Sequence, residues 1–399
     1  MTTTINNEHK KLNVPNLRFK EFEGEWSVTT LQKDCIVNPT NEKIADKFVY
    51  VDLESVKQGQ LYKYQILTKD NAPSRAQRVL HTDDILFQCV RPYQMNNYMV
   101  KGTMSDIQWV ASTGYAQIRT QTDYPAFLYY VLNTSKYNKA VMVRCTGSSY
   151  PAINSEDLSK IPFYKCGIAE QKKIADFLSL LDERIATQNK VIEDLKKLKS
   201  AIIEKHYSQV KKQTTCIADL GEPFSVGSLA KDDLAEIGSP CVIYGELFTT
   251  YGEIIFHIES YTNKTDGMIL SKKGDLLFPS STTVDAMSLI APSVINVDGV
   301  ILGGDMFGIH ISHNYNAQYL SYYFNHIAKK QLAKFAKGST IIHLHYTDIE
   351  KAKLLLPSLE EQNRMAKCLV ALDKKVSVEQ NLLSSLTCQK SFLLQQMFI

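Results

Sequence analysis

Apolar residues recur at alternating steps of three and four positions in two stretches of the chain, 168–207 and 359–398. This spacing is the heptad seam of a coiled coil, and each stretch predicts a helix of roughly 60 Å. Every seam position of the first stretch has an apolar counterpart 191 positions later. The first seam consists of Ile174, Leu178, Leu181, Ile185, Ile192, Leu195 and Ile202, and the second of Met365, Leu369, Leu372, Val376, Leu383, Leu386 and Leu393.

A single helix cannot bury such a seam, and the chain returns through a whole globular segment between the two stretches. We therefore expect the helices to pair as an antiparallel coiled coil with a pseudo-two-fold axis. Gln188 and Glu379 interrupt the seams at matched positions, where they either meet and fix the register or lean out to solvent. Lys199 and Lys390 interrupt the seams a second time, and we expect their long side chains to reach toward water.

The segments before the two helices also repeat at an offset of 191. Asp84–Phe87 has a counterpart in Asp275–Phe278, and Gly147–Ser149 has one in Gly338–Thr340. Strands are predicted at 48–53, 85–90, 116–120 and 161–164, and short helices at 125–132 and 319–324. The predicted fold is α+β, with mixed or antiparallel sheets in two globular domains at 1–165 (opening with a disordered tail at 1–13) and 208–357, and long helices at 166–207 and 358–399.

The duplication is uneven. The helices and the loop anchors align without gaps, whereas residues 88–97 have almost nothing in common with residues 279–288. The two halves therefore share a scaffold and differ in what they present, as expected if each half reads a different target.

Composition narrows the class of protein. A chain of 399 residues, with 44% hydrophobic and 22% charged residues, indicates a globular protein of two or more domains. The net charge of +3 permits nucleic-acid binding without demanding it. The eight cysteines are scattered singly, which favours a reducing compartment over disulfides or a zinc site. With neither a signal peptide nor an apolar run long enough to span a bilayer, the chain is predicted to be cytoplasmic.

Motifs for catalysis are missing from the sequence. It contains no phosphate-binding loop of the Walker type. Asn38–Thr40 is the nearest match to an adenine-methyltransferase motif but lacks the second proline and the aromatic residue, and Gly303–Asp305 is better explained as a tight turn than as a cofactor loop. His343 and His345 have no third ligand nearby, so we predict DNA contact or plain surface for them and no metal site.

The layout resembles the specificity subunit of type I restriction–modification systems, in which two target-recognition domains alternate with two helical regions. Three groups of residues carry this resemblance, and the first and last are similar to the staphylococcal branch of the family. The second half departs from the family in keeping only Gly221–Phe224 of the aromatic lead-in. The three groups are Val14, Pro15, Leu17, Arg18, Phe19, Phe22, Glu25 and Trp26; the helix openings Glu170, Gln171, Glu361 and Gln362; and Ser391, Phe392, Leu393, Gln396, Met397 and Phe398.

The resemblance implies a non-catalytic, DNA-reading subunit of a larger complex. Two methyltransferase (M) subunits would dock on the helices and transfer methyl groups from S-adenosylmethionine to adenines, one in each half-site of double-stranded DNA. A restriction–translocase (R) subunit would complete the enzyme. S-adenosylmethionine, ATP and Mg would then be held by the partners and none by this chain. The alternative is a non-catalytic protein-interaction scaffold with a coiled-coil rod.

Polar loops after the matched strands are the candidate DNA readers. Arg and Lys pair with guanine in the major groove, and Asn and Gln pair with adenine. Tyr150 is a candidate either to stack against an extruded base or to pack in the core. The candidates are Gln88, Arg91, Tyr93, Gln94, Asn96, Asn97, Tyr98, Arg144, Ser148, Ser149 and Tyr150 in the first domain, and Ser280, Ser281, Thr282, Thr283, Lys337, Ser339, Thr340, His343 and His345 in the second.

Overall fold

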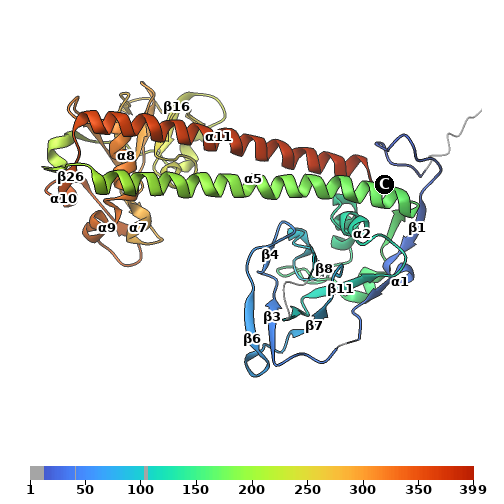
Figure 1. Cartoon of the computed structure of the whole chain (residues 1–399). Coiled ribbons are helices and arrows are strands. Elements are labelled where there is room, and N and C mark those ends of the chain that lie inside the picture. Colours follow the sequence, from blue (N-terminus) through green and yellow to red (C-terminus); the bar gives the residue numbers. More distant parts are fainter. Residues whose placement is uncertain (1–12, 41, 103–106) are drawn as a thin grey trace, which may run out of the picture. The chain divides into compact units, whose positions relative to one another are not determined.

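The computed structural model describes residues 13–40, 42–102 and 107–399, so nearly all of the predicted tail at 1–13 lies outside the described residues. The chain forms two compact units. One comprises the residues up to Asn189 together with Asn381–Ile399, and the other comprises Lys190–Gln380. Each unit therefore contains one globular domain and part of each of the two long helices in Figure 1, which are α5 (Ile168–Gln209) and α11 (Leu359–Gln396).

The two long helices pair in opposite directions. In the first unit, Leu178 near the start of α5 shares a core with Leu393 near the end of α11. In the second unit, Ile203 near the end of α5 shares a core with Leu369 near the start of α11. Neither helix contains a glycine or a proline, so nothing in the sequence interrupts them. The predicted antiparallel pairing is confirmed, and the seam residues are all buried or half-buried.

The polar residues that interrupt the seams at their midpoints are buried as well. Gln188 and Glu379 are 8% and 9% exposed, respectively. The alternative in which both side chains lean out to solvent is therefore excluded. Burial of this kind agrees with a role in fixing the register of the pair.

The lysines of the two seams do not reach toward water, and that expectation is wrong. Lys199 is buried, and its ammonium group lies 2.9 Å from Glu253 and 2.8 Å from Asp373. Lys390 is half-buried, and its ammonium group lies 2.5 Å from Asp182. Acidic side chains within the same unit satisfy each lysine, so neither needs solvent for its charge.

The first unit contains two four-stranded sheets. Its strands are β1 (Ser27–Thr30), β2 (Cys35–Val37), β3 (Lys47–Val51), β4 (Val56–Lys57), β5 (Gln60–Leu61), β6 (Gln65–Thr68), β7 (Ala76–Leu80), β8 (Ile85–Gln88), β9 (Tyr98–Met99), β10 (Gln108–Ser112), β11 (Tyr115–Thr120) and β12 (Pro162–Lys165). Its shorter helices are α1 (Leu31–Asp34), α2 (Pro125–Leu132), α3 (Ser135–Met142), α4 (Ser155–Ser159) and the 3-10 turns η1 (Lys69–Asn71) and η2 (Pro92–Gln94). The sheets have the orders β6-β3-β10-β7 and β2-β11-β8-β9, and β1-β12 and β4-β5 form separate pairs.

The sheet β2-β11-β8-β9 is buried on both faces, which explains the continuous apolar run of β8. Ile85 and Phe87 belong to a core shared with α2 and α5, whereas Leu86 belongs to a core shared with the other sheet. Successive side chains of a strand point to opposite faces. A strand between two cores therefore favours apolar residues at successive positions, as at Ile85–Phe87.

The second unit contains two five-stranded sheets. Its strands are β13 (Gln213–Cys216), β14 (Gly221–Ser225), β15 (Leu234–Ala235), β16 (Ser239–Ile243), β17 (Ile254–Ile255), β18 (Ser260–Thr262), β19 (Ile269–Leu270), β20 (Asp275–Pro279), β21 (Ser281–Thr282), β22 (Ser293–Ile295), β23 (Ile301–Gly303), β24 (Met306–Ile311), β25 (Ile342–His343) and β26 (Lys353–Leu356). Its shorter helices are α6 (Glu246–Thr249), α7 (Ala286–Leu289), α8 (Ala317–His326), α9 (Lys329–Leu332), α10 (Tyr346–Ile349) and the 3-10 turns η3 (Ile217–Leu220), η4 (Lys231–Asp233) and η5 (Ala333–Phe335). The sheets have the orders β14-β24-β20-β22-β17 and β15-β18-β16-β23-β19, and β13-β26 and β21-β25 form separate pairs.

The strand pairings of the two units correspond. The antiparallel pair β8-β11 matches β20-β24, and the parallel pair β3-β10 matches β16-β23. Gly221–Phe224, which the sequence suggests is a remnant of the lead-in, instead forms part of β14 and pairs with β24 as β2 pairs with β11. The counterpart of β1 is β13, since each pairs with the last strand of its own domain.

The N-terminal lead-in, residues 13–26, closes the core of the first unit. The indole ring of Trp26 is buried and lies edge-on to Phe127 and Phe398, with ring centres 5.8 and 6.2 Å away. The Arg18 guanidinium forms a two-pronged ion pair with Glu170, at 2.7 and 2.8 Å. The first and last sequence groups therefore meet in one core, which explains their shared aromatic character.

The Glu–Gln openings of the long helices serve to attach the globular domains. The side-chain oxygen of Gln171 accepts from the backbone N–H of Tyr124, immediately before α2, at 2.9 Å. The side-chain oxygen of Gln362 accepts from the backbone N–H of Asn316, immediately before α8, at 3.0 Å. Both glutamines are almost fully buried. In each unit, therefore, the glutamine amide at the start of a long helix holds the start of the corresponding short helix, α2 or α8.

We expect Gln362→Ala to lower the free energy of unfolding of the second unit by about 2 kcal/mol, because the Asn316 N–H loses its acceptor in a poorly solvated position. Urea unfolding followed by hydrogen exchange in α8 measures this loss. Asn363→Ala is the matched control, because Asn363 also contacts Asn316, at 2.7 Å, but is exposed. An equal loss in the two variants would contradict an attachment role for Gln362.

Among the described residues, no helix combines the length and the apolar character needed to cross a membrane. All eight cysteines fall within the described residues, and all are free thiols.

Candidate nucleic-acid interface

The loop after β8 is fixed by buried amide groups. The side-chain Nε2 of Gln88 donates to Gln94 Oε1 at 2.8 Å, and its Oε1 accepts from the backbone N–H of Asn96 at 3.1 Å. The side-chain oxygen of Asn97 accepts from the backbone N–H of Gln88 at 2.8 Å. Gln88 and Asn97 are 1% and 2% exposed, so our expectation that they face DNA is corrected. Their amides shape the loop from within, because buried amides need internal hydrogen bonds.

The backbone of this loop is strained at two positions. Arg91 and Met95, which flank η2, have φ angles of 55° and 52°, in the left-handed region that bulky side chains rarely adopt. Two hydrogen bonds hold them: Arg91 N–H donates to Pro151 O at 2.8 Å, and Asn138 Nδ2 donates to Pro92 O at 2.9 Å. Strain of this kind persists only where the surroundings enforce it, and it gathers at functional sites.

The strained loop borders a cavity of about 820 Å³ whose lining includes four cationic side chains and one acidic side chain. The guanidinium carbon of Arg91 lies 4.5 Å from the ring centre of Tyr150, which is exposed. Of the predicted readers, those that line the cavity are Gln88, Arg91, Gln94, Asn96 and Tyr150. Three further cationic residues line the cavity, Lys57, Lys63 and Arg75, and they could not be predicted because they come from a short strand and loops without periodicity.

The remaining candidates of the first domain lie outside this cavity. Tyr93 is exposed, whereas Tyr98 is half-buried and lines a different cavity of about 540 Å³ beside the long helices. Arg144 is exposed, and its guanidinium donates to Ala140 O at 2.8 Å. Ser148 and Ser149 are exposed in the turn before Tyr150.

The second domain builds its corresponding loop on the same backbone plan. In the first domain Val90 forms a β-bridge with Ala152. In the second domain the residues 191 positions later, Ser281 and His343, pair in the same way. Ser280 and Ser281 are buried, so the expectation that they face DNA is also corrected. Ser281 lies in the β21-β25 pair, and Ser280, just before it, accepts at its backbone oxygen from Leu344 N–H at 2.9 Å, which explains the burial. Thr282 is half-buried and Thr283 is exposed.

A histidine pair lies beside this loop. The rings of His343 and His345 are parallel to within 11° with centres 6.2 Å apart. They line a cavity of about 470 Å³ with Lys337, whose ammonium group lies 2.5 Å from Asp348. Ser339 and Thr340 are exposed, and they follow Gly338, which also lines the cavity. Within the part of the chain that the structure describes, no cluster of three or more His, Cys, Asp or Glu side chains is placed to hold a metal ion.

Each domain thus has a polar loop with basic side chains in or beside it, an arrangement expected of a protein that reads two DNA segments. The sequence profile of the family described as type I restriction modification DNA specificity domain matches residues 36–197 and 210–387, most of the chain. The chain belongs to this family. It is a DNA specificity subunit of a type I restriction–modification system, and a non-catalytic member of that complex.

Individual proteins of the family are similar along almost the whole chain. A type I restriction enzyme MjaX specificity subunit of Methanocaldococcus jannaschii is 23% identical, over 93% of this chain and 92% of the relative. The S subunit structure from M. genitalium superposes with a TM-score of 0.61 at 17% identity, covering 97% of this chain and 99% of that one. A chain from a study of complex assembly in the type I R-M system superposes with a TM-score of 0.55 at 19% identity, covering 93% and 97%. These structures share the fold of this specificity subunit.

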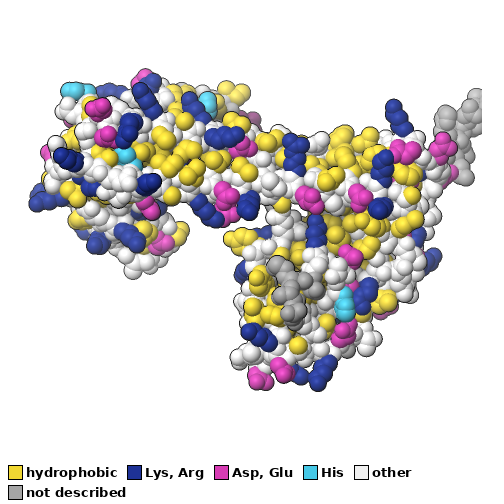
Figure 2. Space-filling model, viewed as in Figure 1, with side chains coloured by type: hydrophobic (Ala, Val, Ile, Leu, Met, Phe, Trp, Pro, Cys, Tyr) yellow, Lys and Arg dark blue, Asp and Glu magenta, His cyan; other side chains and the backbone are white. Residues whose placement is uncertain are grey.

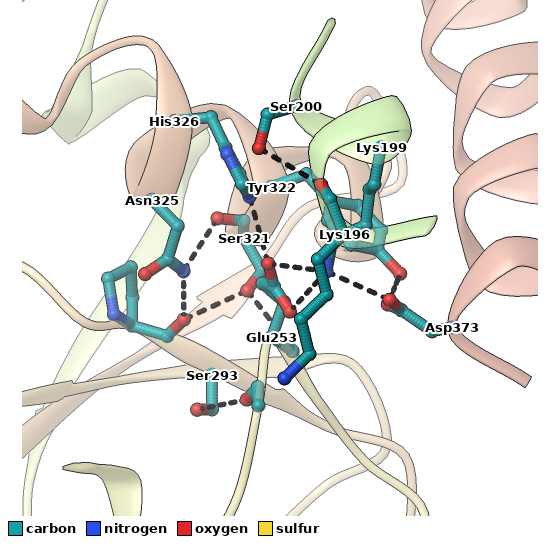
Figure 3. A network of polar contacts seen from close by, with 12 residues as sticks. Lys196, Lys199, Ser200, Glu253, Ser293, Ser321, Tyr322, Asn325, His326 and Asp373 are labelled. Atoms are coloured by element: carbon teal, nitrogen blue, oxygen red, sulfur yellow. Dashed lines mark hydrogen bonds and ion pairs between the residues drawn. The ribbon is translucent and has the colours of Figure 1, made fainter. Parts of the chain in front are cut away.

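In the second unit of the specificity subunit, a buried polar network joins the recognition domain to both long helices (Figure 3). The ammonium group of Lys199, on α5, lies between Glu253 of the recognition domain and Asp373 of α11, at 2.9 and 2.8 Å. His326 Nε2 lies 2.9 Å from Glu253, and the Tyr322 hydroxyl donates to Asp373. The network therefore fixes how the second recognition domain is mounted on its part of the helix pair.

The charges of this network are maintained by their mutual contacts. Burial alone would raise the pKa of Glu253, but the hydrogen bond with His326 and the charge of Lys199 outweigh it and lower the pKa to about 2. Burial alone would lower the pKa of Lys199, but Glu253 and Asp373 raise it above its ordinary value. Both groups are therefore ionised at neutral pH.

The first unit has a simpler version of the same network. Lys390 of α11 pairs with Asp182 of α5 at 2.5 Å, and the Tyr130 hydroxyl donates to Asp182 at 2.8 Å. These residues match Lys199, Asp373 and Tyr322. No residue of the first recognition domain takes the place of Glu253 among the ion pairs of the described residues, so the first lysine has one acidic partner where the second has two.

Proposed function

We propose that this specificity subunit reads a bipartite, asymmetric DNA sequence and that each recognition domain binds one half-site. The observation that supports the proposal is the pair of matched loops, which share a backbone plan and carry different side chains. At matched positions the first domain presents Arg91 and Tyr150, and the second presents Thr282 and Ile341. Two readers of different chemistry on one scaffold suit two different half-sites.

Accessible side chains of these loops are the proposed DNA contacts. Residues with amide, guanidinium or hydroxyl groups near the strained loop are placed to reach base edges, and lysines at the edge of a cavity are placed to reach phosphates. The proposed contacts are Arg91, Tyr93, Gln94, Asn96, Arg144, Ser148, Ser149 and Tyr150 in the first domain and Thr282, Thr283, Lys337, Ser339, Thr340, His343 and His345 in the second.

Two methyltransferase (M) subunits are the proposed partners on the long helices, with a restriction–translocase (R) subunit in the full enzyme. Hydrophobic side chains come to the surface of the helical segments in Figure 2. Exposed apolar residues on a helix outside its seam commonly mark a protein-binding surface. Those with the largest exposed fractions are Leu180 and Ile168 on α5 and Val378 and Phe392 on α11.

The chemistry of the complex belongs, in this proposal, to the partners. S-adenosylmethionine would be bound by the M subunits, and ATP and Mg by the R subunit. The complex would act in the cytoplasm, where the chromosome is. We also propose that the chain falls in the staphylococcal-like branch of the family, because its lead-in and its closing residues carry the resemblance described above.

Binding of duplex DNA in the presence of the methyltransferase partner tests the proposal. We expect a gel-shift titration to show affinity that falls on the order of a thousandfold between 50 and 200 mM salt, because phosphate contacts release counterions. A competitor duplex with one half-site scrambled should bind more weakly than the intact site. Absent or salt-independent DNA binding would instead favour a protein-interaction scaffold.

A further inference from the structure

The neighbours of Arg91 hold its side chain in a position from which it can contact a molecule outside the chain. Its backbone is held in the left-handed region by the hydrogen bond to Pro151, and its guanidinium group stacks on Tyr150. Among the described residues, no oxygen accepts a hydrogen bond from this guanidinium group. A planar donor group that is fixed in orientation and has free donor edges is suited to an acceptor pair of fixed geometry.

The acceptor could be a phosphate or a base, and two observations favour a base. The neighbours of Arg91 in the cavity are the amides of Gln94 and Asn96, which are base-reading groups. The matched position of the second domain is Thr282, 191 residues after Arg91. The N–H of Arg91 binds Pro151, and Thr282 pairs with Ile342, which lies 191 residues after Pro151. A phosphate contact carries no sequence information, so it gives no reason for a cation in one domain and a threonine in the other.

We propose that Arg91, held in place by Tyr150, reads a guanine in the major groove of the half-site bound by the first recognition domain. This inference rests on the proposed function. Guanine presents two acceptors, N7 and O6, to the major groove, and their spacing matches two parallel N–H groups of one guanidinium. The aromatic ring fixes the plane of the guanidinium, so the pair forms with little loss of side-chain freedom.

The test uses the specificity subunit assembled with its methyltransferase partner. Methylome sequencing of cells with the wild-type assembly gives the two half-sites, and exchange of the first domain shows which half that domain reads. Duplexes are then prepared with each guanine of that half-site replaced by 7-deazaguanine, which lacks the N7 acceptor. For wild type we expect one guanine at which the replacement weakens binding about 10- to 100-fold.

For the Arg91→Gln assembly we expect the intact and the 7-deazaguanine duplexes to bind alike, and the methylome to show other bases at that position. Preference in the second half-site should stay unchanged, which shows that the variant is folded. Tyr150→Ala should reduce the discrimination, and Tyr150→Phe should keep it. Lys33→Gln is the matched control, because it also removes one positive charge from the first domain, at an exposed residue of α1 outside the proposed contacts, and it should keep the full discrimination.

The outcomes separate this inference from the function on which it rests. A wild-type assembly that methylates no bipartite site would overturn the proposed function. A bipartite site whose first half contains no guanine, or guanine discrimination that survives in Arg91→Gln, would overturn the inference about Arg91 alone.

Discussion

Replacing Lys199 with methionine should lower the free energy of unfolding of the second unit by about 3–5 kcal/mol. Methionine fills a similar volume but leaves the half-buried carboxylates of Glu253 and Asp373 without the ammonium group that lay 2.9 and 2.8 Å from them. Hydrogen exchange measured along the chain is the suitable readout, because it separates the two units. We expect faster exchange in α8 and β22 and little change in the first unit.

Two further variants show whether the loss comes from unpaired charge. In the double variant Lys199→Met/Glu253→Gln, the second substitution removes one of the two unpaired carboxylates, so part of the lost stability should return. Lys390→Met at the matched position should cost less than half as much, because it leaves one carboxylate unpaired, that of Asp182, where Lys199→Met leaves two. Equal losses for Lys199→Met and Lys390→Met would show that packing, and not charge, is responsible.

Exchange of residues 30–165 for the first domain of another family member should replace one half of the methylated sequence and leave the other half intact. The reason is that each domain has its own cores and its own attachment to its part of the helix pair. Methylome sequencing of cells that carry the exchanged subunit and the methyltransferase partner measures the outcome directly.

The exchange needs a donor domain that keeps the attachment points. Within the exchanged segment, the backbone N–H of Tyr124 binds Gln171, and the Tyr130 hydroxyl binds Asp182. A donor with tyrosine at the position of Tyr130 is therefore the appropriate choice. The reciprocal exchange of residues 213–356 is the matched control and should change only the other half. If either exchange altered both halves, the two domains would not be independent readers.

The architecture could be predicted from the sequence wherever a period or a repeat encoded it. The seam from Ile174 to Ile202 has the period of a buried helix face, and its copy 191 positions later predicts the antiparallel pair. Residues Ile85–Phe87 of β8 are apolar at consecutive positions because both faces of the strand are covered, and the shortness of the run distinguishes it from a helix.

Contacts between residues far apart in sequence could not be predicted in this way. Lys199 occupies a seam position, where a charged group was expected to extend toward water. Its ammonium group instead pairs with the carboxylate of Glu253, which comes from an irregular segment 54 residues later. Gln88 was expected to face DNA because polar residues after a strand are commonly exposed, yet it is buried by hydrogen bonds within the loop. Composition says which residue types are available near a site, and only the tertiary fold decides which of them remain accessible.

The unequal networks around the two lysines carry a consequence for how such genes evolve. Glu253 belongs to the second recognition domain, whereas both partners of the first network that pair as ions, Lys390 and Asp182, belong to the helices. When recombination between genes brings in a new first domain, the ion pair of the recipient stays complete. A new second domain must bring its own carboxylate, or Lys199 loses one of its two acidic partners in a buried position. The ion pairs of the scaffold therefore place fewer demands on a new first domain than on a new second domain.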